Sequence, residues 1–174
     1  MAVTGRYPAS GIVREGAAPG RVIWITGVSR SGKTTLGRAL ADALESPQSG
    51  APPLLLDGDE LRDVLQDYRY GADDRRRLAS IYARLARLAA LQRHDVIVAT
   101  ISLFHEIHDW NRANLPNYLE VLLRDPASPS SASGNDEGSP HVVEWPRAPD
   151  LLLAARSEDN VARVLTELQS RRAA

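Results

Sequence analysis

The sequence contains no cysteine, which excludes several kinds of chemistry. With 0 cysteines among its 174 residues, the chain can form neither a disulfide nor a cysteine zinc site, and it has no thiol nucleophile. It also lacks any run of the ~20 apolar residues that a membrane helix needs, and residues 1–20 lack the apolar core of a signal peptide. We therefore expect a cytoplasmic protein that has no membrane partner.

The sequence also lacks an excess of charge of either sign. Its 21 Lys and Arg residues stand against 22 Asp and Glu residues, a net charge of -1. This balance provides no general attraction to nucleic acid, so we expect no nucleic-acid partner. The length suits one domain. We expect a flexible tail over residues 1–20, rich in Gly, Ala and Pro, and a single domain over residues 21–174.

Short apolar runs alternate with helical patterns along the chain. The runs predict strands, and apolar residues spaced three and four apart predict helices. The expected strands are residues 21–26, 54–57, 95–100, 118–123 and 151–155. The expected helices are residues 33–44, 60–68, 73–93 and 104–114, followed by a last helix that Ser157 caps. The alternation predicts an α/β fold in which helices cover both faces of a five-stranded parallel sheet.

The first strand is followed by a glycine-rich loop that matches G-x-x-x-x-G-K-[ST] in full. Its backbone N–H groups suit phosphate oxygens, its lysine can reach the β and γ phosphates, and its threonine hydroxyl suits Mg²⁺. The motif predicts a P-loop NTPase or kinase fold with ATP as co-substrate and Mg²⁺ as cofactor. Arg30 is bulky for this loop, and we expect it to point outward. The expected ATP-binding residues are Gly27, Val28, Ser29, Arg30, Ser31, Gly32, Lys33, Thr34 and Thr35.

A P-loop enzyme needs an acid at the end of a neighbouring strand to help hold Mg²⁺. The strand at residues 95–100 ends without one, whereas the strand at residues 54–57 ends on Asp57. We therefore predict that Asp57 and Thr34 serve the metal, and that Asp59 orients the acceptor hydroxyl and accepts its proton. The alternative is that Asp57 and Asp59 form only a turn and a helix N-cap.

The segment LDGDELR, residues 56–62, follows this phosphate loop, and with it the chain resembles the adenylylsulfate (APS) kinase family. The likeness covers residues 22–123 and, more weakly, residues 142–153. It also includes VIWITGVSRSGKTT and VIVATIS. The family transfers phosphate from ATP to the ribose 3′-hydroxyl of adenylyl sulfate, giving 3′-phosphoadenylyl sulfate, and is usually dimeric. The resemblance thus implies a kinase with ATP and a small nucleotide as partners, with adenylyl sulfate as the default acceptor, and a homodimer.

The resemblance also assigns roles to residues. It implies that Lys33, Asp57, Asp59 and Ser102 are catalytic. Ser102 matches a family serine traditionally described as a phosphoserine, but at a strand end it suits a hydrogen-bonding role. The implied acceptor-binding residues are Asp59, Arg62, Tyr70, Arg75, Ile101, Ser102 and Arg112.

Three departures from the family pattern leave alternatives open. Leu78 replaces a family asparagine, and ISLFH at residues 101–105 replaces Ile-Ser-Pro-Tyr/Phe-Arg. The segment that begins with ISLFH, residues 101–121, instead resembles a sister branch of the family, to which the cytidine diphosphoramidate kinases belong. The family's Arg-Asp-Pro-Lys-Gly-Leu-Tyr lid is replaced by a Ser-, Pro- and Gly-rich loop at residues 125–141. The chain could therefore be a non-catalytic ATP-binding module, or Arg147 or a partner could supply lid groups. A GTPase is disfavoured, since no Asn-Lys-x-Asp motif follows.

Overall fold

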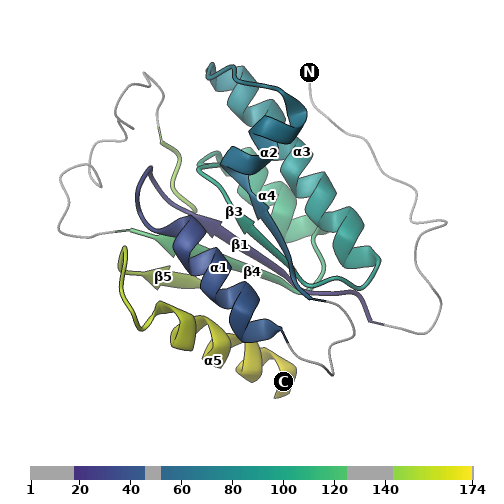
Figure 1. The fold of residues 1–174 in the computed structure, drawn as a ribbon, viewed down its shortest axis with the longest axis vertical. Coiled ribbons are helices and arrows are strands. Elements are labelled where there is room, and N and C mark those ends of the chain that lie inside the picture. The colour runs from purple at the N-terminus through teal and green to yellow at the C-terminus, as the bar shows by residue number, and fades with distance from the viewer. Residues whose placement is uncertain (1–17, 46–51, 125–142, 174) are drawn as a thin grey trace.

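A computed structural model describes residues 18–45, 52–124 and 143–173 of the chain. Its five strands form one sheet in the order β2-β3-β1-β4-β5, and every neighbouring pair is parallel (Figure 1). The strands are β1 (Val22–Thr26), β2 (Leu54–Asp57), β3 (Val96–Ala99), β4 (Tyr118–Leu123) and β5 (Leu151–Leu153). The helices are α1 (Lys33–Leu44), α2 (Gly58–Leu65), α3 (Ala72–Leu91), α4 (His105–Asn114) and α5 (Asn160–Ala173). The predicted α/β fold is confirmed.

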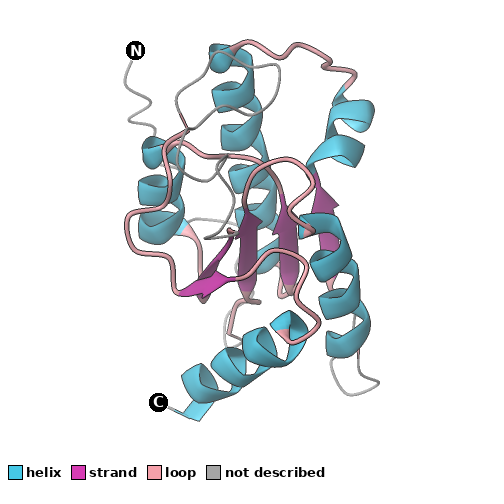
Figure 2. Ribbon diagram, turned by 90° about the vertical axis from the view of Figure 1, so that its left-hand side faces the viewer, coloured by secondary structure: helices cyan, strands magenta, loops and turns pink. Residues whose placement is uncertain are grey.

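Alternating residues of β1 face two separate cores. Val22 and Trp24 pack with buried residues of α3 and α4, whereas Ile23 and Ile25 pack with buried residues of α1 and α5. All four side chains are at most 1% exposed. Successive side chains of a strand point to opposite faces, so a strand that is apolar throughout requires helices on both sides. Figure 2 shows helices on both sides of the strands.

Some predicted boundaries are wrong. Helix α2 begins at Gly58, because the Asp57 carboxylate caps it by accepting the N–H of Asp59. Helix α5 begins at Asn160 and not directly after Ser157. There the Ser157 carbonyl, and not a side-chain cap, accepts the Asn160 N–H at 3.3 Å. Residues 1–17 of the tail expected at residues 1–20, and the loop expected at residues 125–141, lie outside the described residues. Among the described helices, none combines the length and apolarity that a bilayer crossing requires.

A buried carboxylate in the middle of β4 joins this strand to α4. Glu120 is 2% exposed. Its Oε1 lies 2.6 Å from His108 Nδ1 and accepts the Tyr118 hydroxyl at 3.0 Å, while its Oε2 accepts from Arg112 Nη2 at 2.8 Å. Burial alone would raise the pKa of Glu120, but these hydrogen bonds hold the pKa below its usual 4.5.

A second carboxylate extends the network to α5. Asp150 precedes β5 and accepts the backbone N–H of Glu120 at 2.7 Å. It also accepts from Arg171 of α5 at 2.8 Å. Two acids and their arginines therefore hold α4, β4, the start of β5 and α5 together, and loss of either acid would leave buried donors without acceptors.

We expect Glu120→Gln to lower the free energy of unfolding at pH 7 by about 3 kcal/mol, since a buried, hydrogen-bonded charge pair is broken. The folded-state pKa of Glu120 is depressed, so its contribution is complete above pH 4.5 and is lost as the pH falls through the folded pKa. Urea denaturation at pH 7 and at about pH 4 measures both effects. The control is Glu60→Gln, at a side chain that is 62% exposed. If Glu120→Gln lowered the free energy of unfolding equally at the two pH values, the lowered pKa assigned to Glu120 would be contradicted.

Candidate active site

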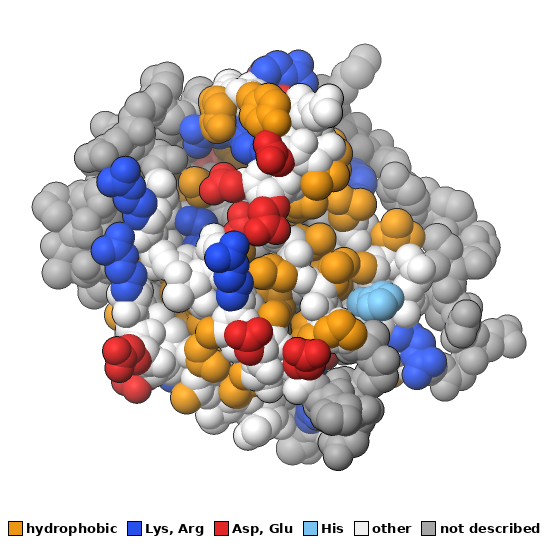
Figure 3. All heavy atoms as spheres, viewed as in Figure 1, with side chains coloured by type: hydrophobic (Ala, Val, Ile, Leu, Met, Phe, Trp, Pro, Cys, Tyr) orange, Lys and Arg blue, Asp and Glu red, His pale blue; other side chains and the backbone are white. Residues whose placement is uncertain are grey.

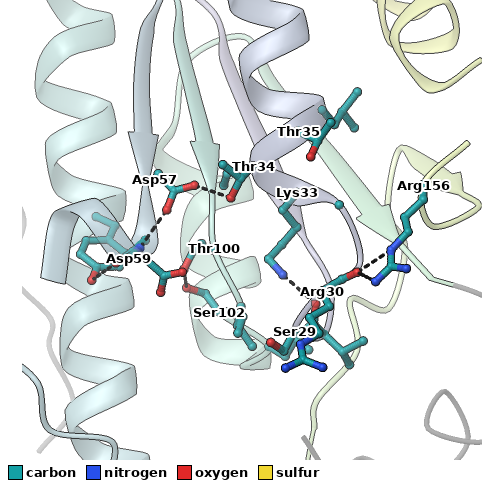
Figure 4. A pocket seen from close by; sticks show the side chains of 18 of the residues that line it. Ser29, Arg30, Lys33, Thr34, Thr35, Asp57, Asp59, Thr100, Ser102 and Arg156 are labelled. Atoms are coloured by element: carbon teal, nitrogen blue, oxygen red, sulfur yellow. Dashed lines mark hydrogen bonds between the residues drawn. The ribbon is translucent and has the colours of Figure 1, made fainter. Parts of the chain in front are cut away.

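The carboxyl ends of three neighbouring strands bring the predicted motifs together. Ile25 of β1 and Asp57 of β2 both lie level with Ala99 of β3. The loops that follow these strands therefore meet at one edge of the sheet, where ligands of open α/β sheets bind. A cavity of about 750 Å³ opens at this edge, and Figure 4 shows its polar side chains.

The phosphate loop needs both of its glycines. Gly27 has a φ of 153°, and a Cβ atom there would lie 2.5 Å from the carbonyl oxygen of Leu123. Gly32 has a left-handed φ of 96°. Gly27 and Ser31 are buried and do not line the cavity. Seven of the nine predicted ATP-binding residues line it, namely Val28, Ser29, Arg30, Gly32, Lys33, Thr34 and Thr35.

Lys33 reaches back across the phosphate loop. Its Nζ donates to the carbonyl oxygen of Val28 at 2.7 Å, and the residue is only 9% exposed. It is the only lysine of the chain. A phosphate group in the loop would offer this ammonium a charged acceptor in place of a neutral carbonyl, and charge-assisted hydrogen bonds are the stronger ones.

Asp57 is shared between the phosphate loop and α2. Its Oδ2 accepts the Thr34 hydroxyl at 2.6 Å, and its Oδ1 accepts the N–H of Asp59 at 2.9 Å. The residue is 5% exposed. The predicted N-cap is therefore present, and the same carboxylate also contacts Thr34, the other residue predicted to serve the metal. Asp59 lines the same cavity and is exposed to it.

Two arginines flank an aromatic ring at the other end of the cavity. The guanidinium carbon of Arg62 lies 4.6 Å from the centre of the Tyr70 ring, and that of Arg75 lies 5.9 Å from it. Arg75 Nε also donates to the Tyr70 carbonyl at 3.1 Å. Tyr70 is 57% exposed. The three residues line the cavity as the resemblance implies, and they present two positive charges beside a ring that is open to a ligand.

Small polar groups lie between these two ends. The hydroxyl oxygens of Thr100 and Ser102 are 3.1 Å apart and buried. The Tyr82 hydroxyl donates to the carbonyl of Gly58 at 3.2 Å. Burial raises the pKa of Tyr82 above its usual 10.0, and the carboxylates of Asp59 and Asp57 raise it further, against the influence of Arg62. Ile101 also lines the cavity.

Arg112 lies apart from the other predicted acceptor-binding residues. Its guanidinium pairs with Glu120 and Asp150, and it is not among the cavity-lining residues. Arg147, considered as a lid group, contacts Asp109 at 3.4 Å and His105 at 3.3 Å and does not line the cavity either.

The sequence analysis missed two groups of cavity residues. Thr100 is not an acid, so the search for a metal-binding acid at a strand end does not point to it. Its place directly after β3 nevertheless puts it at the ligand-binding edge. The second group lies in the loop after β5 and at the start of α5, where the same strand-end reasoning applies. The members of this second group are Arg156, Ser157, Glu158, Asn160 and Val161. Arg30 is exposed, as expected.

The surface around these elements carries charges of both signs. On the face drawn in Figure 3, basic side chains are interspersed with acidic ones and with apolar patches. Such a surface gives a charged small molecule no broad field to follow, so its recognition depends on the local groups of the cavity.

Comparisons with known proteins agree with this geometry. A family model described as adenylylsulphate kinase matches residues 19–133. The cytidine diphosphoramidate kinase of Campylobacter jejuni is 43% identical over 102 residues, which are 59% of this chain and 59% of that protein. The adenylyl-sulfate kinase of Deinococcus deserti is 38% identical over 114 residues, which are 65% of this chain and 62% of that protein. The chain thus covers less than two thirds of the length of these two relatives.

Among solved structures, the Mycobacterium tuberculosis APS kinase in complex with AMPPNP and APS is similar with a TM-score of 0.70. The two chains are 25% identical, and the match covers 88% of this chain and 99% of that one. The sheet and its helices are therefore those of a P-loop kinase.

We expect two substitutions of Asp57 to differ in stability. Asp57→Ala removes the N-cap of α2 and the partner of Thr34, and should lower the free energy of unfolding by about 1–2 kcal/mol. Asp57→Asn keeps an oxygen that can accept the Asp59 N–H, so its loss should be less than half as large. Urea denaturation compares them, with Asp63→Ala, at an exposed position of α2, as control. Equal losses in the two Asp57 variants would show that the charge, and not the cap, stabilises α2.

Proposed function

The chain belongs to the adenylylsulphate kinase family, and we propose that it transfers the γ-phosphoryl group of ATP to a ribose hydroxyl of a small nucleotide. One observation carries the proposal. The phosphate loop, the Thr34–Asp57 pair at 2.6 Å and Asp59 line a single cavity. Phosphoryl transfer is catalysed mainly by positioning and by electrostatic stabilisation, and these residues place a cation, two acids and the loop's backbone N–H groups around one space.

In this proposal the phosphate loop holds the donor. Its N–H groups and the N-terminus of α1 face the phosphates. Lys33 gives up the Val28 carbonyl and donates to the β and γ phosphate oxygens. Charge that develops on the transferring group is then stabilised by an ammonium that is already in the loop, at little cost of reorganisation.

Thr34 and Asp57 fit Mg²⁺. A hydroxyl and a carboxylate are the hard oxygen ligands that this ion prefers, and it commonly takes only one or two protein ligands beside phosphates and water. In agreement, the described residues contain no cluster of three acidic, His or Cys side chains that could hold a metal alone. When bound, the ion would neutralise charge on the phosphates.

Asp59 is the proposed catalytic partner of the acceptor. Its backbone is fixed by the hydrogen bond to Asp57 at 2.9 Å, while its side chain is exposed to the cavity. It can therefore accept the proton of an incoming hydroxyl group. Arg62 and Arg75 face acidic groups of the acceptor, and the Tyr70 ring stacks on its base.

Two acceptors are candidates, adenylyl sulfate and cytidine diphosphoramidate. The cytidine compound is favoured by two observations. Sequence identity is 43% to the relative named as a cytidine diphosphoramidate kinase and 38% to the relative named as an adenylyl-sulfate kinase. In addition, Leu78 is 1% exposed and lines the cavity, so it offers no hydrogen bond where the APS kinase pattern has an amide.

We expect purified protein with Mg-ATP to phosphorylate cytidine diphosphoramidate at a higher kcat/KM than adenylyl sulfate, as measured by mass spectrometry of the nucleotide products. Product from adenylyl sulfate alone would reverse this order. ATP binding without product from either compound would instead support the non-catalytic ATP-binding module.

Lys33→Ala should lower the rate of transfer at least ~100-fold, because it removes the ammonium nearest the transferring group. Because Lys33 is the only lysine, ATP should also protect this one side chain from an amine-specific reagent, as read by peptide mass spectrometry. Arg38→Ala, at an exposed position of α1, is the control. Near-wild-type rates in Lys33→Ala would refute the assigned role.

Asp57→Asn and Asp59→Asn should impair phosphoryl transfer in different ways. Asp57→Asn should weaken the response to Mg²⁺, so that saturation needs at least ~10-fold more of the ion. Asp59→Asn should lower kcat by ~100-fold or more, with the Mg²⁺ response unchanged. Steady-state rates over a magnesium titration separate the two. Indistinguishable titrations would contradict the division of roles.

A further inference from the structure

An arginine in the loop between β5 and α5 lines the cavity and contacts the phosphate loop. Arg156 donates to the carbonyl oxygen of Arg30 from Nε at 2.9 Å and from Nη2 at 2.7 Å. Arg30 lies in the middle of the phosphate loop, three residues before Lys33. Figure 4 shows the guanidinium reaching the loop from the side opposite Asp57. One carbonyl of the loop therefore accepts two hydrogen bonds from a single charged group.

The stem of Arg156 also lies next to Gly32 of the loop. A Cβ atom at Gly32 would lie 3.4 Å from Arg156 Cγ and 3.6 Å from its backbone nitrogen. Arg156 thus lies beside the residues on both sides of Ser31, which is 4% exposed.

Both partners have an uncommon backbone conformation. The φ angles of Arg30 and Arg156 are each 60°, in the left-handed region that residues with bulky side chains seldom adopt. Such conformations persist only where the surroundings hold them. For Arg30, the two hydrogen bonds to its carbonyl supply that restraint.

The restraint extends to the interior of the loop. The C=O and N–H of one trans peptide point in opposite directions, so a fixed Arg30 carbonyl also fixes the N–H of Ser31. That N–H lies 3.3 Å from the Val28 carbonyl oxygen, which also accepts from Lys33 Nζ at 2.7 Å. The guanidinium of Arg156 is therefore connected, through one peptide group, to the carbonyl that holds the Lys33 ammonium.

The loop that carries Arg156 is itself anchored. Asn160 is 3% exposed, and its Nδ2 donates to the Ala154 carbonyl at 2.8 Å. This hydrogen bond ties the first residue of α5 to the end of β5 and closes the turn in which Arg156 lies. Arg156 thus projects from a turn that this hydrogen bond closes.

We propose that Arg156 is a positioning residue, which keeps the middle of the phosphate loop in the shape that receives the nucleotide phosphates. It acts through the backbone of Arg30 and touches neither the base nor the reacting phosphate. The inference rests on the proposed function, since it requires that the loop bind a nucleotide.

Calorimetric titrations with ATP, ADP and inorganic tripolyphosphate, each with Mg²⁺, test the proposal. Arg156→Ala should raise the Kd for all three ligands by about tenfold, equivalent to about 1.4 kcal/mol. Arg156→Lys should recover only part of the loss, because an ammonium cannot reproduce the fork of a guanidinium. Arg163→Ala, at an exposed position of α5 outside the cavity, is the matched control and should bind like the wild type. Thermal melts establish that each variant is folded, and Arg156→Lys carries the test if Arg156→Ala is not.

Each other pattern of binding overturns the proposal. Loss for ATP and ADP but not for tripolyphosphate would mean that Arg156 contacts the base or ribose. Loss for ATP and tripolyphosphate but not for ADP would mean that it contacts the γ-phosphate. Wild-type affinities for all three ligands would mean that the contact has no role in binding. Absence of ATP binding by the wild type would instead refute the proposed function, and this inference with it.

A double-substitution cycle tests whether Arg156 acts through Arg30. A general effect of Arg156 on the structure would not change with the residue at position 30. Glycine adopts a φ of 60° without strain, so Arg30→Gly should make the loop less dependent on Arg156. The increase in Kd caused by Arg156→Ala should therefore be about threefold smaller in the Arg30→Gly background than in the wild type. An equal increase in the two backgrounds would overturn the proposed route through Arg30.

Discussion

The register of the three central strands determines where the reacting groups of the cavity lie. Ile25 and Asp57 stand level with Ala99, so the phosphate loop, the aspartate turn and Thr100 leave the sheet at the same height. Side chains of a strand alternate between faces, so a slip of β2 by one residue would turn Asp57 to the opposite face. Thr34 would then lose its 2.6 Å partner.

The remaining wall of the cavity depends on the other half of the sheet. Glu144 accepts the N–H of His105 at the start of α4 at 2.7 Å, and its own N–H donates to the Leu103 carbonyl at 3.1 Å. Helix α4 is in turn held on β4 by the contacts of Glu120 with His108 and Arg112. The loop that carries Ser102 is thus fastened, at its end next to α4, by polar contacts that take no part in the proposed chemistry.

The sequence was sufficient for features that follow from local pattern. The phosphate loop, the strands and the aspartate turn could be predicted because glycine placement, apolar runs and a strand-final acid are each read within a few residues. Groups that meet only through tertiary structure could not be. Arg112 matched a family position, yet it pairs with the buried Glu120, which lies on the next strand. Arg156 is separated from its partner Arg30 by 126 positions, and no local signal connects them.

Lysine and arginine have different roles in this structure. Apart from Lys33, all the Lys and Arg side chains of the chain are arginines. The guanidinium groups of Arg21, Arg112 and Arg156 each donate more than one hydrogen bond to fixed acceptors, a task that suits a planar, permanently charged fork. In the proposed function the ammonium of Lys33 has a different task, because it leaves a carbonyl for a phosphate. A compact charge on a flexible stem can exchange acceptors within a closed loop, whereas a guanidinium would need more room and a fixed orientation.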